Sequence, residues 1–141
     1  MNPREHRANL EVDALHQFFT GWFTGQLQPH DAVFARFAGA LAPEFEMITP
    51  SGVLRPRDVL IASLRGAHGV WGHDPGATIE IRAHRSTALP GGPYTLARYE
   101  EWQRLDGRWR GRLSTALLRE AAGAPNGLEW VHVHETWMPE A

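Results

Sequence analysis

A change in hydrophobic period near residue 78 constrains the fold of this chain more than any other feature of its sequence. Before this point apolar residues recur every three or four positions, which is typical of helices, whereas after it they alternate every second position, as in strands. Turn-forming segments rich in Gly, Pro, Asn and Asp separate four predicted strands, at residues 78–86, 94–105, 108–120 and 128–137. Helices gathered first and strands gathered last predict an α+β fold rather than a doubly wound sheet.

In the first half of the chain, Gly, Pro and Asp residues mark where short helices and strands begin and end. Gly and Pro end predicted helices, and Asp at a helix start satisfies free backbone N–H groups. We expect five elements here: a helix of residues 11–23 that begins with acidic residues, a second helix capped by Asp31 that reaches Leu41 and stops at Pro43, two short strands around the turn at residues 50–52, and a third helix from Pro56 to Gly66 or Gly69.

The composition is that of one globular domain, which we place at residues 1–141. The formal net charge of −2 predicts no nucleic-acid partner, and no apolar run is long enough for a membrane span or a signal peptide. There is no cysteine, so disulfides and thiolate chemistry are excluded. We therefore expect a cytoplasmic protein without a cofactor or a metal.

Three stretches of the chain carry a resemblance to a known superfamily: FEMITPSGVLRPRDVLIASL, ARYEEWQRLDGRW and the closing WVHVHETW. They resemble the nuclear transport factor 2-like superfamily, and within it the SnoaL-like and ketosteroid-isomerase-like domains. The resemblance implies a cone-shaped, curved antiparallel sheet wrapped around the N-terminal helices, with a cavity at its open end. It also implies homodimers that pair through the outer sheet face. Thr49 stands where the isomerases have their aspartate base, which argues against the isomerase reaction.

A two-residue Asp106-Gly107 turn sets the register between the predicted strands 94–105 and 108–120, because a two-residue hairpin loop leaves no freedom in the pairing. It pairs Leu105 with Arg108 and sorts the side chains into two faces. We expect the leucine-rich face to cover the helix: Leu96, Arg98, Glu100, Trp102, Leu113, Thr115 and Leu117. The opposite face, which contains a Glu101–Arg112 pair, is then expected to meet solvent or a second subunit.

Arg98, Glu100 and Thr115 are the polar residues of this leucine-rich face. A buried charge needs a partner or a water-filled cavity. One interpretation is that Arg98 and Glu100 satisfy each other. The other is that they line the cavity mouth, where Arg98 would hold an anionic or carbonyl group and Glu100 would transfer a proton.

The last predicted strand contains a His-x-His pattern, His132 and His134, that is compatible with zinc. A zinc site needs a third protein ligand, and no spacing ties His68, His73 or His84 to the pair, so we predict no metal. Two orientations of the strand stay open. Either both histidines face the cavity, or Glu135 does, and a desolvated Glu135 would have a raised pKa that suits a general base.

The aromatic side chains of the helices, Trp22 among them, are expected to form the core, and in an open cavity Trp22 and Trp102 are also candidates for an apolar wall. The leading hypothesis is a protein that binds a small, apolar to amphipathic molecule, with Arg98, Thr115 and His132 at the polar end of the site. The alternative is a cofactor-independent isomerase, cyclase or dehydratase in which Glu100, His134 or Glu135 moves a proton. A third hypothesis is a structural dimerisation module.

Overall fold

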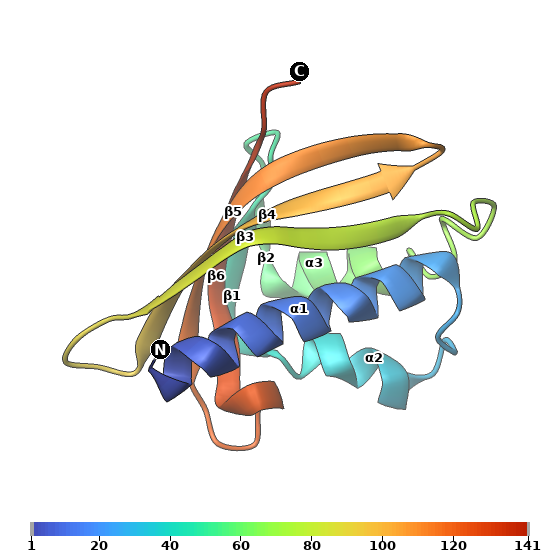
Figure 1. Ribbon diagram of the computed structural model, residues 1–141. Coiled ribbons are helices and arrows are strands. Elements are labelled where there is room, and N and C mark those ends of the chain that lie inside the picture. The colour runs from blue at the N-terminus through green and yellow to red at the C-terminus, as the bar shows by residue number, and fades with distance from the viewer. Residues whose placement is uncertain (1, 141) are drawn as a thin grey trace.

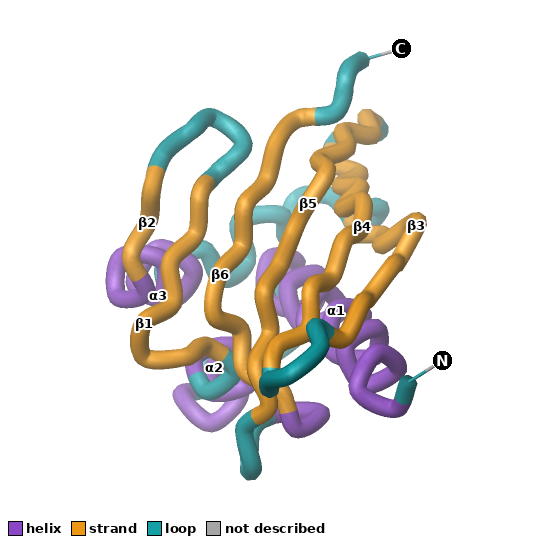
Figure 2. The backbone as a smooth tube through the Cα atoms, turned by 90° about the vertical axis from the view of Figure 1, so that its left-hand side faces the viewer, coloured by secondary structure: helices purple, strands orange, loops and turns teal. Residues whose placement is uncertain are grey.

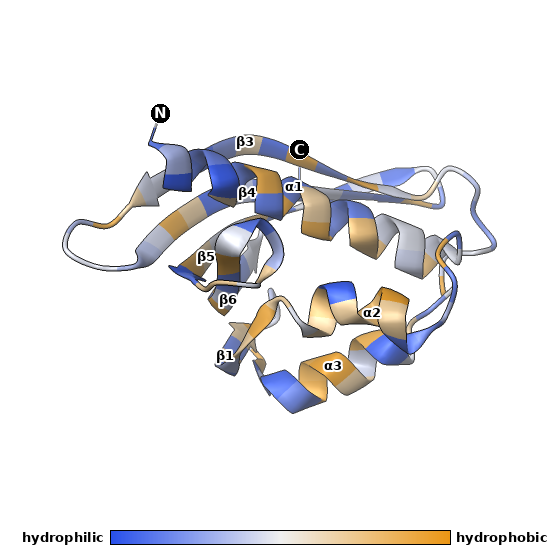
Figure 3. Ribbon diagram, turned by 90° about the horizontal axis from the view of Figure 1, so that it is seen from below, coloured by the Kyte–Doolittle hydropathy of each residue, from blue (hydrophilic) through white to orange (hydrophobic). Residues whose placement is uncertain are grey.

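The computed structural model describes residues 2–140 and consists of helices packed against one curved sheet (Figure 1). The helices are α1 (Pro3–Thr24), α2 (Asp31–Ala38) and α3 (Arg57–Arg65), with a short 3-10 helix η1 (Pro125–Gly127). Seen from below, α2 and α3 lie together beside β1, and both carry many apolar residues (Figure 3). No helix within residues 2–140 is long and apolar enough to cross a membrane.

Six strands form a single sheet in the order β2-β1-β6-β5-β4-β3 (Figure 2). They are β1 (Leu41–Ile48), β2 (Leu54–Pro56), β3 (Thr78–Ala88), β4 (Tyr94–Leu105), β5 (Arg108–Glu120) and β6 (Leu128–Trp137). The bounds of β4, β5 and β6 that the turn residues predicted are confirmed. The α+β class is also confirmed, although β1 and β6 run parallel, so the sheet is mixed rather than wholly antiparallel.

The first helix begins eight residues earlier than predicted, because a capping box at Asn2 starts it there. The Asn2 side chain accepts a hydrogen bond from the backbone N–H of Arg4, and Glu5 reaches back to the backbone N–H of Asn2. At the other end Gly25, with φ of 80°, provides the left-handed cap that ends α1 as expected.

The prediction for the second helix is wrong at both ends. His30 is the N-cap residue and Asp31 lies in the first turn, where its charge favours the positive helix end. The helix stops at Ala38, and Leu41 and Pro43 belong to β1. Proline is tolerated there because β1 pairs irregularly with β6 between Leu41 and Glu46.

The hairpin register is confirmed pair by pair, from Leu105 opposite Arg108 to Leu96 opposite Leu117. The expected orientation of its two faces is wrong. Ala97, Tyr99, Glu101, Ser114 and Ala116 are buried against the helices, and Leu113 is 43% exposed on the outer face. Small residues such as Ala97 and Ala116 allow α1 to approach the concave side closely. The polar residues of that side, such as Ser114, form hydrogen bonds with other buried polar side chains. Counting leucines therefore selects the wrong face.

Of the two orientations proposed for β6, the one with Glu135 on the concave side is confirmed and the one with both histidines there is wrong, and a bulge divides the strand. Leu118 pairs with Trp130 and Leu117 with His132, so Val131 is an extra residue. The bulge changes the alternation. Trp130 on one side of it and Val133 and Glu135 on the other side are all buried on the concave face.

A fully buried carboxylate, Glu11, joins four elements of the fold. It accepts hydrogen bonds from both terminal nitrogens of Arg36 in α2, at 2.7 and 3.1 Å. It also accepts hydrogen bonds from Asn126 Nδ2 at 2.9 Å and from Trp130 Nε1 at 3.0 Å. These donors satisfy both carboxylate oxygens, which is how a buried charge is tolerated.

Candidate functional site

A cavity of about 130 Å³ lies on the concave side of the sheet and is lined by residues of α1, α2, α3, β1 and the inner faces of β4, β5 and β6. Most of its wall is apolar. The apolar lining residues are Leu15, Phe19, Phe23, Phe37, Leu41, Phe45, Met47, Leu60, Leu64, Trp130 and Val133. The cavity is therefore suited to an apolar molecule.

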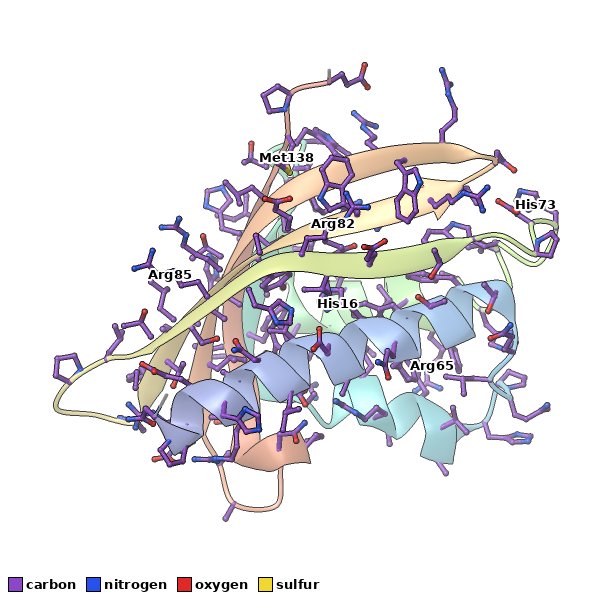
Figure 4. The ribbon with its side chains drawn as sticks, in the orientation of Figure 1. His16, Arg65, His73, Arg82, Arg85 and Met138 are labelled. Atoms are coloured by element: carbon purple, nitrogen blue, oxygen red, sulfur yellow. The ribbon has the colours of Figure 1, made fainter. Side chains whose placement is uncertain are left out.

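Four acidic or basic side chains meet at the polar wall of this cavity, beside the Tyr99 phenol, and we call them the cavity cluster: His16, Glu101, Arg112 and Glu135. Figure 4 shows His16 between α1 and the sheet, whereas Arg82 lies on the opposite side of the sheet. His16 Nε2 lies 3.0 Å from Glu101 Oε1, and Arg112 Nη1 donates to Glu135 Oε1 at 3.1 Å. The exposed fractions of His16, Glu101 and Glu135 are 4%, 5% and 4%, so the charges are shielded from water.

The contacts of His16 require that both ring nitrogens carry protons. Nδ1 lies 2.7 Å from the carbonyl oxygen of Val12, which can only accept a hydrogen bond. Nε2 faces a carboxylate oxygen, which accepts a hydrogen bond when ionised. Burial lowers the pKa of His16, but the charge and hydrogen bond of Glu101, with the Val12 carbonyl, outweigh burial and raise the pKa above its ordinary value. His16 and Glu101 therefore form a buried ion pair.

The two carboxyl groups of the cluster differ in acidity. Burial raises the pKa of Glu101, but His16, Arg112 and a hydrogen bond of 2.6 Å from Gln103 Nε2 together bring it down to about 2. Burial and the negative charge of Glu101 raise the pKa of Glu135 to about 7, against the opposing influence of Arg112 and Ser114. Glu101 therefore stays ionised, whereas Glu135 changes its protonation near neutral pH.

Two hydroxyl groups extend the cluster on the sheet. Ser114 Oγ donates to Glu135 Oε2 at 3.0 Å, and the Tyr99 hydroxyl lies in hydrogen-bonding contact with Ser114. Burial and the nearby carboxylates raise the pKa of Tyr99 well above its ordinary value, so the phenol stays neutral and acts as a donor.

The arrangement can bind a polar group and can exchange one proton with it. A carboxyl group whose pKa lies near the working pH is the type of residue that general acid–base catalysis uses. Structural ion-pair networks also shift pKa values, so the shift by itself indicates a candidate site rather than a reaction.

The structure brings one of the eight predicted site residues, Glu135, into the cavity wall. Trp22 is buried in the core, where its Nε1 donates to the Leu64 carbonyl at 2.7 Å, and it does not line the cavity. The other six lie on the outer face or follow its alternation, so their expected place in the cavity is wrong: Arg98, Glu100, Trp102, Thr115, His132 and His134.

The outer-face residues make contacts of their own. Trp102 Nε1 donates to Glu100 at 2.9 Å, and the guanidinium of Arg82 lies 4.8 Å from the Trp102 ring centre. Arg98 is exposed and, in the described part of the chain, forms no ion pair with Glu100. Within residues 2–140 there is no cluster of three or more His, Cys, Asp or Glu side chains that could hold a metal ion.

From the sequence we missed His16 and expected the Glu101–Arg112 pair to meet solvent or a second subunit. A signal for His16 was present, since it follows Val12 and Leu15 on the apolar stripe of α1 and is the only charged or histidine side chain in the run LHQFF. A polar residue on a buried stripe needs a partner, and the Glu101 face of the hairpin supplies one.

Comparison with known proteins places these features in a family. The sequence model of the family described as "Sucrose-6-phosphate phosphohydrolase C-terminal" matches residues 9–139. Sucrose-phosphatase 1 of Nicotiana tabacum is 27% identical over 135 residues, which cover 93% of this chain and 31% of that protein. The chain therefore spans about a third of the length of this curated relative.

Solved structures agree on the fold. A nuclear transport factor 2-like protein of unknown function from Pseudomonas aeruginosa is 26% identical, with a TM-score of 0.81 over 94% of this chain and 99% of that chain. A putative dehydratase of the same fold from Streptomyces avermitilis is 11% identical, with a TM-score of 0.66 over 96% of both chains. The expected superfamily is thus confirmed, and the chain belongs to the sucrose-6-phosphate phosphohydrolase C-terminal family, which is built on the nuclear transport factor 2-like fold.

Proposed function

We propose that this domain binds a small, largely apolar organic molecule in the cavity, with the polar end of the molecule at the cavity cluster. The observation that carries the proposal is an apolar cavity whose only ionisable lining residues, within residues 2–140, converge on one wall. Such a combination of an apolar pocket with a few convergent polar groups is typical of ligand sites. The raised pKa of Glu135 also points to this wall of the cavity, because strongly shifted pKa values are common at functional sites.

The cavity suits neither the size nor the polarity of a disaccharide. The relatives of the chain are named sucrose-phosphatases, and sucrose exposes hydroxyl groups on all sides. Against phenylalanine and leucine walls those hydroxyl groups would lose their hydrogen bonds to water, which costs about 1–3 kcal/mol each. We therefore propose that the ligand of this cavity is not a sugar phosphate.

A cofactor-independent isomerase, cyclase or dehydratase is the alternative that the protonation of Glu135 favours. In that case Glu135 replaces Glu100 as the residue that moves the proton, because Glu135 lines the cavity. Binding remains the first proposal, since Thr49 stands at the isomerase base position.

Filling the cavity tests the binding proposal. Benzamide is a neutral probe with a benzene-sized ring and one polar end, and we expect it to raise the melting temperature of the protein. Val133 is 8% exposed and lines the cavity, so the larger side chain in Val133→Phe should weaken benzamide binding by about tenfold or more.

Val59→Phe is the matched control, because Val59 is 51% exposed on α3. This variant should bind benzamide like the wild type when both affinities are measured by calorimetric titration. Equal benzamide affinity in wild type and Val133→Phe would show that the cavity is not the binding site.

We also propose that the outer sheet face joins two copies of the chain. Leu113 is 43% exposed and Trp109 42% exposed on this side of the hairpin, and large exposed apolar side chains grouped on one face often mark interaction sites. Sedimentation equilibrium should show a dimer for the wild type and mainly monomer for Leu113→Glu, because the added charge would be buried at the interface. A monomeric wild type would refute the proposal.

A further inference from the structure

The guanidinium of Arg112 is only partly used by the residues around it. Its Nη1 donates to Glu135, but its Nε is buried and has no hydrogen-bond partner among residues 2–140. The Glu101 Oε2 atom lies 4.0 Å from Nε, which is beyond hydrogen-bonding distance. A buried donor of a charged group without an acceptor is costly.

The position of this unpaired donor distinguishes it from the others in the described chain. Buried side-chain atoms without a partner occur in Arg4, Arg57, His84, Thr95 and Arg112. Of these residues only Arg112 lines the cavity. The missing acceptor of Arg112 can therefore come from a molecule held in the cavity.

We propose that the ligand of the cavity is a small monocarboxylic acid, bound as its anion with the carboxylate accepting from the Nε edge of Arg112. This inference rests on the proposed binding function and names its ligand class. Arginine offers a planar fork of N–H donors that matches the geometry of a carboxylate. The aromatic and aliphatic walls contact the hydrocarbon part of the acid.

The charges of the cavity cluster favour one negative charge in the ligand. Protonated His16 and ionised Glu101 balance each other. Arg112 is balanced by Glu135 only when Glu135 is ionised. When Glu135 takes up a proton, the cluster carries one net positive charge, because Glu101 is shared by His16 and Arg112, and a bound monoanion restores neutrality. A cationic ligand would instead add to the uncompensated charge.

The size of the cavity limits the acid. A dry apolar cavity of about 150 Å³ holds a molecule of the size of benzene, and this cavity measures about 130 Å³. Because this volume is slightly smaller, the hydrocarbon part of the acid is limited to one ring or a short chain, and long-chain fatty acids are excluded.

The anion and Glu135 compete for Arg112, so binding is coupled to proton uptake. The ionisable groups that face Glu135 are His16 from α1, Tyr99 and Glu101 from β4, and Arg112 from β5, while α2, α3 and β1 present apolar residues. Since the pKa of Glu135 is about 7, affinity for the anion should fall as pH rises above that value.

Benzoate, benzamide and benzylammonium are probes of equal ring size that carry a negative charge, no charge and a positive charge. Calorimetric titration at about pH 6 should give an affinity for benzoate about 10- to 100-fold higher than for benzamide, and no measurable binding of benzylammonium. Arg112→Met should remove the preference for benzoate over benzamide. The benzoate affinity of the wild type should fall about tenfold per pH unit above about pH 7, and this dependence should be lost in Glu135→Gln.

Arg110→Met is the matched control, because Arg110 is exposed and, like Arg112, lies over the ring of Trp137, at 3.5 Å from the ring centre against 4.8 Å for Arg112. It should keep the preference for benzoate. If Arg112→Met does not fold, Arg112→Lys keeps the charge without the Nε donor and should still lose about tenfold in benzoate affinity.

The possible results separate this inference from the proposed function. Equal binding of benzoate and benzamide, both blocked by Val133→Phe, would overturn the carboxylate and leave the binding cavity in place. Failure of every probe to bind, in wild type as in Val133→Phe, would overturn both.

Discussion

Replacing Glu11 by alanine is expected to lower the free energy of unfolding by about 3–5 kcal/mol, as much as removing a large side chain from the core. Glu11 is 0% exposed and accepts hydrogen bonds from Arg36, Asn126 and Trp130. Its removal leaves the Arg36 charge and two polar donors without their acceptor inside the fold. Urea unfolding followed by circular dichroism measures the loss directly.

The control for Glu11 is Glu44, which also binds an arginine through both carboxylate oxygens, at 2.9 and 3.0 Å from Arg119. The Glu44 side chain is 56% exposed, so water replaces the lost contacts and Glu44→Ala should have a much smaller effect. Similar losses in the two variants would show that burial of Glu11 does not determine its contribution.

The stability of the wild type is expected to fall as pH rises from about 4.5 to about 7, by about 3 kcal/mol from Glu135 alone. The pKa of Glu135 is higher in the folded chain than in the unfolded chain, so the folded state holds more protons throughout this window. Rising pH therefore favours unfolding. His16 acts in the same direction, because its raised pKa gives a stabilisation that is present below its unfolded pKa and is lost as pH rises through its folded pKa.

Glu101 has the opposite dependence at lower pH. Its pKa is lowered to about 2, so its stabilisation is complete above the unfolded value of 4.5 and is lost as pH falls towards the folded value. The three residues together predict that the cavity cluster contributes most to stability near pH 5 and less on either side.

Glu135→Gln isolates the contribution of Glu135. Relative to the wild type, this variant should gain about 3 kcal/mol in unfolding free energy between about pH 5 and about pH 8, as measured by denaturant unfolding at both values. Glu100→Gln, on the outer face, should show no such gain. A difference between Glu135→Gln and wild type that does not change with pH would mean that Glu135 does not titrate in this range.

Local signals in the sequence predicted most of the elements. The Asp106-Gly107 turn determined the hairpin register because only two residues connect its strands. Gly and Pro located the ends of β4, β5 and β6. The capping box at Asn2 and Glu5 was equally readable and would have placed the start of α1 correctly.

The candidate site was less predictable, because it depends on which face of the sheet meets α1. The alternation showed which residues share a face but did not show which face is buried. Leucine content favoured the outer face, whereas the inner face combines alanines with polar residues that satisfy one another. The bulge at Val131 then brought Trp130 and Glu135 to the same side, although they are five residues apart.

By itself, then, the sequence determined the α+β class, the hairpin register and the absence of cysteine chemistry, because turns, periods and residue types act over short distances. The tertiary structure decided the site. His16 and Glu101 are 85 residues apart, and Arg112 and Glu135 are 23 apart, so only the packing of α1 against the curved sheet brings these charges together. Their pKa values follow from that shared burial, which no local pattern records.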